Sequence, residues 1–189
     1  MFLDIDKHSP EALALKDNEG FAMTYGELVA EVKSFYPDIK KRAIAFILFK
    51  NTVGAMIGYL GFVHHDVVPL MLSSKIDAEL LKKLMNTYTP AYLWVPKEDS
   101  KKFHFKNVYE RCEYLLLETE NEVYPINDKL QLLMTTSGST GSPKLVRYKR
   151  GNLEANAKNV SIAFGWTSSE RPVCDLGMQY TMGLNVINT

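Results

Sequence analysis

Four short, largely apolar runs divide the chain, and each has the length of a buried strand. They cover residues 43–49, 67–70, 92–95 and 130–134. Continuous apolar runs, as opposed to alternating ones, are typical of strands that are packed on both faces of a parallel sheet. Two further runs, residues 145–148 and 172–176, predict strands in the last quarter of the chain.

Between these runs, hydrophobic residues recur three or four positions apart, which is the spacing of one face of a helix. This spacing covers residues 28–35, 53–63, 76–85 and 153–164. Capping boxes formed by Thr24 with Glu27 and by Ser74 with Asp77 predict the start of two helices, and Asn152 is the expected N-cap of the last one. Because a helix between two strands allows a parallel crossover, the alternation predicts an α/β fold: a mostly parallel sheet flanked by helices.

Residues 135–144 have a different character and follow the last buried run directly. Their sequence is Thr-Thr-Ser-Gly-Ser-Thr-Gly-Ser-Pro-Lys. The two glycines let consecutive backbone amides point inward, a concavity that suits anions, and the hydroxyls can donate hydrogen bonds to phosphate oxygens. Lys144 adds a positive charge that no nearby acidic residue neutralises. The segment therefore predicts a polyphosphate site, although composition alone favours an ordinary flexible turn.

The two common nucleotide-binding loops do not match this segment. A Walker loop ends in Gly-Lys before Ser or Thr, whereas Lys144 follows Pro143, and the chain has no G-x-G-x-x-G string. The segment instead resembles the phosphate-binding signature T-S-G-S/T-T-G-x-P-K of the adenylate-forming (AMP-binding) enzymes, which include acyl-CoA synthetases, peptide-synthetase adenylation domains and luciferases. The resemblance implies a catalytic role for Lys144. It implies that the nucleotide phosphates are bound by Thr136, Ser137, Gly138, Ser139, Thr140, Gly141 and Lys144.

Other segments resemble the same family in the same order. Residues 23–28 are similar to its early L-T-Y-x-E-L element, and residues 178–184 resemble its acyl-pocket motif, which makes Tyr180 and Gly183 the expected substrate-binding residues. A packed core tyrosine is the alternative for Tyr180. Family members usually carry histidine where this chain has Arg150. Since residues 178–184 contain no carboxylate to pair with an ammonium group, an α-amino acid is disfavoured, and fatty and aryl acids stay open.

The resemblance implies the activation of a small carboxylic acid. The acid would attack the α-phosphate of ATP, with Mg²⁺ as a cofactor, to give acyl-AMP and pyrophosphate. Coenzyme A or an acyl or peptidyl carrier protein would then accept the acyl group. An interaction module, or a nucleotide-binding module without synthetase activity, is the alternative function.

Family members are considerably longer than this chain. Nothing in it resembles their later adenine and ribose pocket, their acidic magnesium ligand or the lysine of their C-terminal lid. We therefore expect residues 1–189 to be one incomplete N-terminal AMP-binding domain, without the lid and inactive alone. We also expect the chain to self-associate through its last third, or to fray there, because apolar side chains near its end would be uncovered. These are Val173, Leu176, Met178 and Leu184.

Composition and charge indicate which partners, metal sites and cellular locations are expected for this protein. The formal net charge is zero, so no broad attraction to nucleic acid or to a membrane surface is expected. Cys112 and Cys174 form neither a metal-binding spacing nor a disulfide framework, and the four histidines lack zinc spacing, so no metal site is expected. The start of the chain is unlike a signal peptide, and residues 64–66 interrupt the apolar stretch 55–72, which excludes a membrane span there. A cytoplasmic protein is the resulting expectation.

Overall fold

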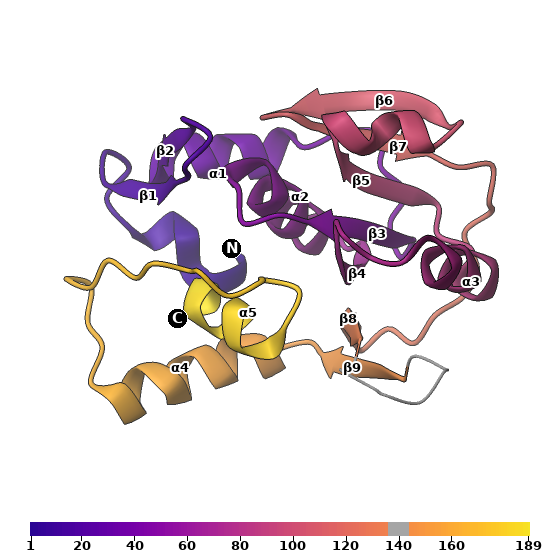
Figure 1. Cartoon of the computed structure of the whole chain (residues 1–189). Coiled ribbons are helices and arrows are strands. Elements are labelled where there is room, and N and C mark those ends of the chain that lie inside the picture. Colours follow the sequence, from indigo (N-terminus) through magenta and orange to yellow (C-terminus); the bar gives the residue numbers. More distant parts are fainter. Residues whose placement is uncertain (136–143) are drawn as a thin grey trace.

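The computed structural model describes residues 1–135 and 144–189, and its centre is a seven-stranded sheet (Figure 1). The strands are β3 (Ile44–Phe49), β4 (Val68–Ser73), β5 (Tyr92–Pro96), β6 (Lys106–Arg111), β7 (Tyr114–Glu118), β8 (Leu130–Thr135) and β9 (Leu145–Lys149). Their order across the sheet is β6-β7-β5-β3-β4-β8-β9. The central strands β5, β3, β4 and β8 are parallel, whereas β7 and β6 on one side and β9 on the other are antiparallel to their neighbours. The predicted α/β fold is confirmed.

Helices cover both faces of this sheet. They are α1 (Tyr25–Ser34), α2 (Val53–His64), α3 (Ala78–Tyr88), α4 (Asn152–Phe164) and α5 (Thr181–Asn188), with the short 3₁₀ helices η1 (Phe2–Lys7) and η2 (Lys97–Lys102). A separate small hairpin consists of β1 (Leu13–Lys16) and β2 (Ala22–Thr24). Because side chains alternate along a strand, Ile47 of β3 packs in the core with residues of α1 and α2, while Phe46 packs in the core with residues of α3. None of the described helices is long and apolar enough to cross a membrane.

The crossover helix α2 is enclosed on almost every side, since residues 53–62 are all buried. It lies close to β5 because it carries glycine where the two elements meet. A Cβ atom at Gly58 would lie 2.2 Å from Cδ1 of Trp94. The indole N–H of Trp94 in turn donates to the Gly54 carbonyl at 2.9 Å. This contact fixes α2, and with it the turn that joins β3 to α2.

The predicted helix starts are correct for α1 and shifted for α3 and α4. The capping box of Thr24 and Glu27 is confirmed. The box predicted at Ser74 is wrong, because the N-cap of α3 is Asp77, whose carboxylate accepts from the Leu80 N–H at 2.9 Å. The N-cap of α4 is Gly151, at a φ of 79°, so the cap predicted at Asn152 is wrong by one residue.

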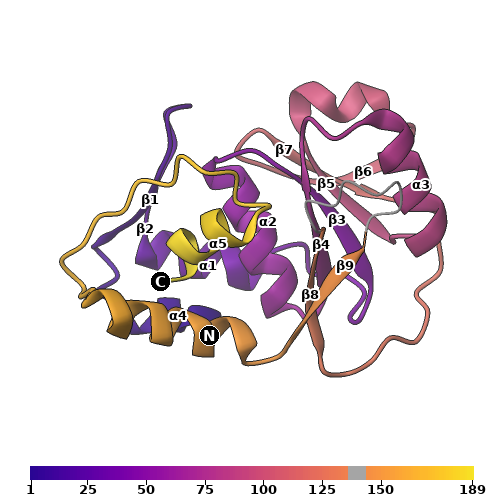
Figure 2. The ribbon, with the colours of Figure 1, turned by 60° about the horizontal axis from the view of Figure 1, so that its bottom comes forward.

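The strand predicted at residues 172–176 is also wrong. This segment is irregular, and the carbonyls of Cys174 and Leu176 accept hydrogen bonds from a side chain instead of a neighbouring strand. Of the four apolar side chains expected to be uncovered near the end of the chain, two are exposed. Val173 and Leu176 are exposed, whereas Met178 and Leu184 are buried in the core that α2 shares. Figure 2 shows α5 beside α2, where the Tyr59 hydroxyl donates to Asn188 at 3.2 Å.

Candidate functional site

The parallel strands place their carboxyl ends along one edge of the sheet. β3 ends at Phe49, β4 at Ser73, β5 at Pro96 and β8 at Thr135. The antiparallel pairing of Thr135 with Leu145 brings the chain back to the same edge at Lys144. In open α/β sheets, ligands bind outside the carboxyl ends of the strands. The segment predicted to bind phosphate therefore begins and ends at the edge where this type of fold binds its ligands.

The nucleotide-binding residues predicted within that segment lie outside the described part of the chain. They are Thr136, Ser137, Gly138, Ser139, Thr140 and Gly141. Lys144, the remaining one, is described and exposed. Its ammonium group has no carboxylate partner among residues 1–135 and 144–189. A free ammonium group at this edge can bind a phosphate oxygen.

Lys75 is a second exposed cation at this edge, and sequence reasoning missed it. It follows β4, the strand next to β8, and its backbone N–H donates to the Ser73 hydroxyl at 3.1 Å. Like Lys144, it has no ion pair with any residue that the structure describes. Lys75 follows β4 and Lys144 directly precedes β9, so two exposed lysines lie at the carboxyl edge of the sheet.

At the other ends of the strands, away from Lys144, a charged cluster anchors the base of the β8–β9 hairpin. Arg42 donates to Asp66 at 3.0 Å and to the carbonyls of Leu130 and Asn127 at 3.1 and 2.7 Å. Arg150 pairs with the same Asp66 carboxylate. Burial alone would raise the pKa of Asp66, but the hydrogen bonds from Arg150 and Arg42 outweigh it and hold this pKa below its usual value. Arg150, where the family usually has histidine, thus fixes the base of the hairpin instead of facing its loop.

Tyr180 and Gly183 lie at the start of α5. Tyr180 is its N-cap and is 53% exposed, so the alternative of a packed core tyrosine is wrong. Gly183 is buried, and a Cβ atom there would lie 2.4 Å from the Gly177 carbonyl oxygen. Glycine therefore allows the first turn of α5 to close against the preceding loop. No hydrogen bond within the described parts of the chain joins these two residues to Lys144, and Figures 1 and 2 both show α5 apart from β9.

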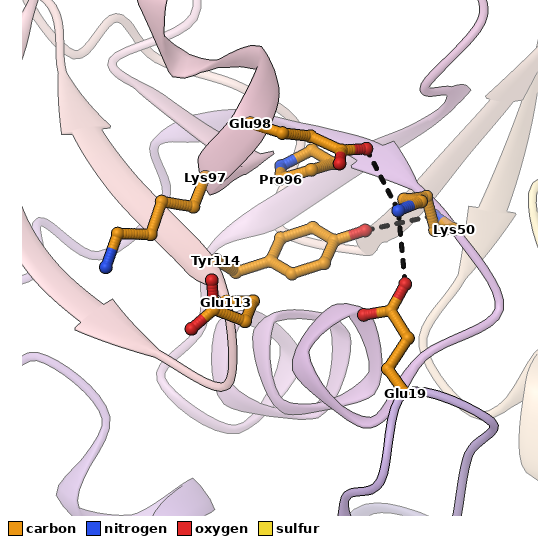
Figure 3. A pocket seen from close by; sticks show the side chains of 7 residues that line it. All are labelled: Glu19, Lys50, Pro96, Lys97, Glu98, Glu113 and Tyr114. Atoms are coloured by element: carbon orange, nitrogen blue, oxygen red, sulfur yellow. Dashed lines mark hydrogen bonds and ion pairs between the residues drawn. The ribbon is translucent and has the colours of Figure 1, made fainter.

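In the part of the chain that the structure describes, a cavity of about 170 Å³ lies beside the ends of β3 and β5 (Figure 3). Lys50 donates there to Glu19 at 3.1 Å and to Glu98 at 3.0 Å. The hydrogen bond to Glu98 raises the pKa of Lys50, with burial opposing it and Glu19 adding to it. This lysine is therefore already neutralised by two carboxylates. Since ligand pockets usually measure roughly 300–1,000 Å³, the cavity is also too small for a nucleotide.

The described residues do not supply a metal centre. Within residues 1–135 and 144–189, no group of three or more His, Cys, Asp or Glu side chains lies in an arrangement that could hold a metal ion. Among the acidic groups at the carboxyl edge, Glu19 and Glu98 pair with Lys50, and Asp77 caps α3. These residues therefore do not fit a resident Mg²⁺ ion, and the cations at this edge are the groups available to phosphate.

A family model described as AMP-binding enzyme matches residues 4–188. The chain belongs to this family. The AMP-binding match spans the whole seven-stranded sheet and all five α-helices, including the β8–β9 hairpin and α5. A search of curated proteins found no significant match.

Several solved structures share the fold of this chain. The o-succinylbenzoate CoA synthetase MenE from Bacillus subtilis, in complex with an acyl-adenylate intermediate, is 22% identical with a TM-score of 0.76, over 98% of this chain and 40% of that one. VinN is 17% identical with a TM-score of 0.78, over 98% of this chain and 52% of VinN. Apo MatB from Rhodopseudomonas palustris is 18% identical with a TM-score of 0.77, over 100% of this chain and 43% of MatB. The AMP-binding chain thus shares their fold and spans about half of their length.

Proposed function

We propose that residues 1–189 provide the phosphate-binding part of an enzyme that activates a carboxylic acid with ATP. The observation that carries this proposal is the position of Lys144, exposed and without an ion pair among the described residues, where the β8–β9 hairpin reaches the carboxyl edge. Membership of the AMP-binding family and the similarity to structures of a CoA synthetase with an acyl-adenylate, and with ATP and magnesium, support it.

In the proposed reaction, a carboxylate oxygen of the acid attacks the α-phosphorus of ATP. A new bond forms between the carboxylate oxygen and the α-phosphorus. The bond between the α-phosphorus and the oxygen that bridges to the β-phosphorus breaks, and pyrophosphate leaves with the bonding electron pair. Negative charge grows on that leaving group, so a cation held nearby stabilises the transition state. We assign this role to Lys144, with the backbone amides and hydroxyls of residues 136–141 as the remaining phosphate ligands.

The acid would bind beside Tyr180 and Gly183, and coenzyme A or a carrier protein would accept the acyl group. Among the similar proteins, MenE was solved with an o-succinylbenzoate adenylate and VinN with 3-methylaspartate. The described part of residues 178–184 offers no carboxylate to an ammonium group, which favours fatty or aryl acids over α-amino acids for this chain.

The test is acid-dependent exchange of labelled pyrophosphate into ATP by the natural protein that contains these residues. A panel of fatty, aryl and amino acids is offered one at a time. Exchange that requires one class of acid is the expected result. Protection of residues 136–143 against protease by ATP, without exchange with any acid, would instead favour a nucleotide-binding module. Neither exchange nor protection would favour an interaction domain.

A further inference from the structure

Asn51 links two segments that are far apart in the sequence. It lies in the turn between β3 and α2, at the carboxyl edge of the sheet. Its Nδ2 group donates to the carbonyls of Cys174 and Leu176, both at 2.8 Å. Its Oδ1 atom accepts from the backbone N–H of Met178 at 3.2 Å. One half-buried side chain therefore holds the loop 174–178 by three backbone groups.

This loop leads directly into the start of α5. The backbone N–H of Tyr180 donates to the Gly177 carbonyl at 2.9 Å, and Gly183 packs against that same carbonyl. The far end of α5 is held separately, by the hydrogen bond from Tyr59 to Asn188. The exposed ring of Tyr180 thus belongs to a short segment that hydrogen bonds fix at both ends.

The turn that carries Asn51 is itself held in place. The Tyr114 hydroxyl accepts from the Lys50 N–H at 3.0 Å, and the Asp17 carboxylate accepts from the Val53 N–H at 2.9 Å. A side chain on such a turn has little freedom to follow a moving loop. Only an amide side chain supplies both two donor hydrogens and an acceptor in this position. Aspartate has nearly the same shape, but an ionised carboxylate can only accept, so it would repel the two carbonyls.

We propose that Asn51 is a positioning residue for the carboxylic-acid substrate: its contacts with residues 174–178 set where Tyr180 and Gly183 meet the acid. This role rests on the proposed function. The role concerns binding of the acid and not of ATP. Asn51 contacts the segment before α5, and among the described residues it makes no hydrogen bond to the β8–β9 hairpin.

The test compares Asn51→Ala and Asn51→Asp with Asn159→Ala in the natural protein. Asn159 is an exposed α4 residue whose side chain makes no hydrogen bond among the described residues, so it is the matched control. In acid-dependent pyrophosphate exchange, we expect the KM for the acid to rise about tenfold or more in both Asn51 variants. The KM for ATP should stay within about twofold, and the control should leave both constants unchanged. Asn51→Ser, which keeps one donor and adds no charge, serves if the other variants fail to fold.

Amide hydrogen exchange gives a readout that does not need activity. Exchange of residues 178–184 should accelerate about tenfold or more in the Asn51 variants, while β3 and β4 keep their protection. An unchanged KM for the acid, or an equal rise in both KM values, would overturn the positioning role while leaving the proposed function intact. Absence of pyrophosphate exchange in the unsubstituted protein would overturn the proposed function, and the substrate role of Asn51 with it.

Discussion

The Tyr114 hydroxyl should contribute measurably to stability, although it is a single polar group in an apolar core. Tyr114 is 2% exposed. Its hydroxyl accepts from the Lys50 N–H at 3.0 Å and donates to the Leu48 carbonyl at 3.1 Å. The Tyr114→Phe substitution removes this group without changing the ring. It leaves the Lys50 N–H, in the β3–α2 turn, and the Leu48 carbonyl, in β3, without this partner.

The expected cost follows from these two hydrogen bonds. An orphaned buried N–H costs about 1–3 kcal/mol, and the second hydrogen bond contributes about 0.5–1.5 kcal/mol. Because Lys50 lies in a turn and its residue is only half-buried, we expect a total near the lower end, about 2 kcal/mol. For a chain of this length, each kcal/mol lowers Tm by roughly 2–4 °C, which gives a decrease of about 4–8 °C.

Urea unfolding and thermal melting of the two proteins would measure this difference. Tyr109→Phe is the matched control, because Tyr109 is half-buried and its hydroxyl makes no hydrogen bond among the described residues. The control should change stability by less than about 0.5 kcal/mol. Equal effects of the two substitutions would refute the claim that the Tyr114 hydroxyl holds the turn that carries Asn51.

Three further predictions concern the start of α5, the charged cluster around Asp66 and the exposed apolar side chains. Gly183→Ala should lower the free energy of unfolding by about 1–3 kcal/mol, because its Cβ would lie 2.4 Å from the Gly177 carbonyl oxygen; an unchanged urea midpoint would contradict this. The lowered pKa of Asp66 means that its ionised form stabilises the fold above the unfolded pKa of about 3.9, and that this stability is lost as the pH falls toward the folded pKa. The stability difference between wild type and Asp66→Asn should therefore shrink below about pH 4, and a constant difference would contradict the ion pairs. Phe164 and Val173, 70% and 85% exposed, should favour self-association at high concentration, which sedimentation would detect and which Phe164→Ser should weaken; a monomer at all concentrations would contradict it.

The sheet and most of its helices could be predicted from the sequence because local patterns determine them. The run at residues 43–49 has no polar interruption, and β3 is buried along its whole length. The capping box at Thr24 needs only residues within one helical turn. In both cases, the residues that decide the structure are neighbours in the chain, so their spacing is sufficient.

The loop 174–178 could not be predicted because its conformation depends on a distant residue. The apolar character of Val173 and Leu176 predicts a strand, but the carbonyls of this segment bind Asn51, more than a hundred residues earlier. The only local signal is that Asn51 closely follows a buried strand, at the edge where such sheets bind ligands. The paired state of Arg150 likewise depends on Asp66, which lies far away in the sequence.

The central claim is that the β8–β9 hairpin presents Lys144 to the phosphates of ATP, and one comparison tests it most directly. Acid-dependent pyrophosphate exchange is measured for the natural protein, for Lys144→Ala and for Lys149→Ala, an exposed lysine of β9 without an ion pair among the described residues. A hydrogen bond to a charged group contributes about 1.5–3 kcal/mol, so Lys144→Ala should slow exchange roughly ten- to a hundredfold at saturating ATP, with an unchanged Tm. Lys149→Ala should retain the wild-type rate. Unchanged exchange in Lys144→Ala would contradict the account, because the hairpin would then not be the phosphate site.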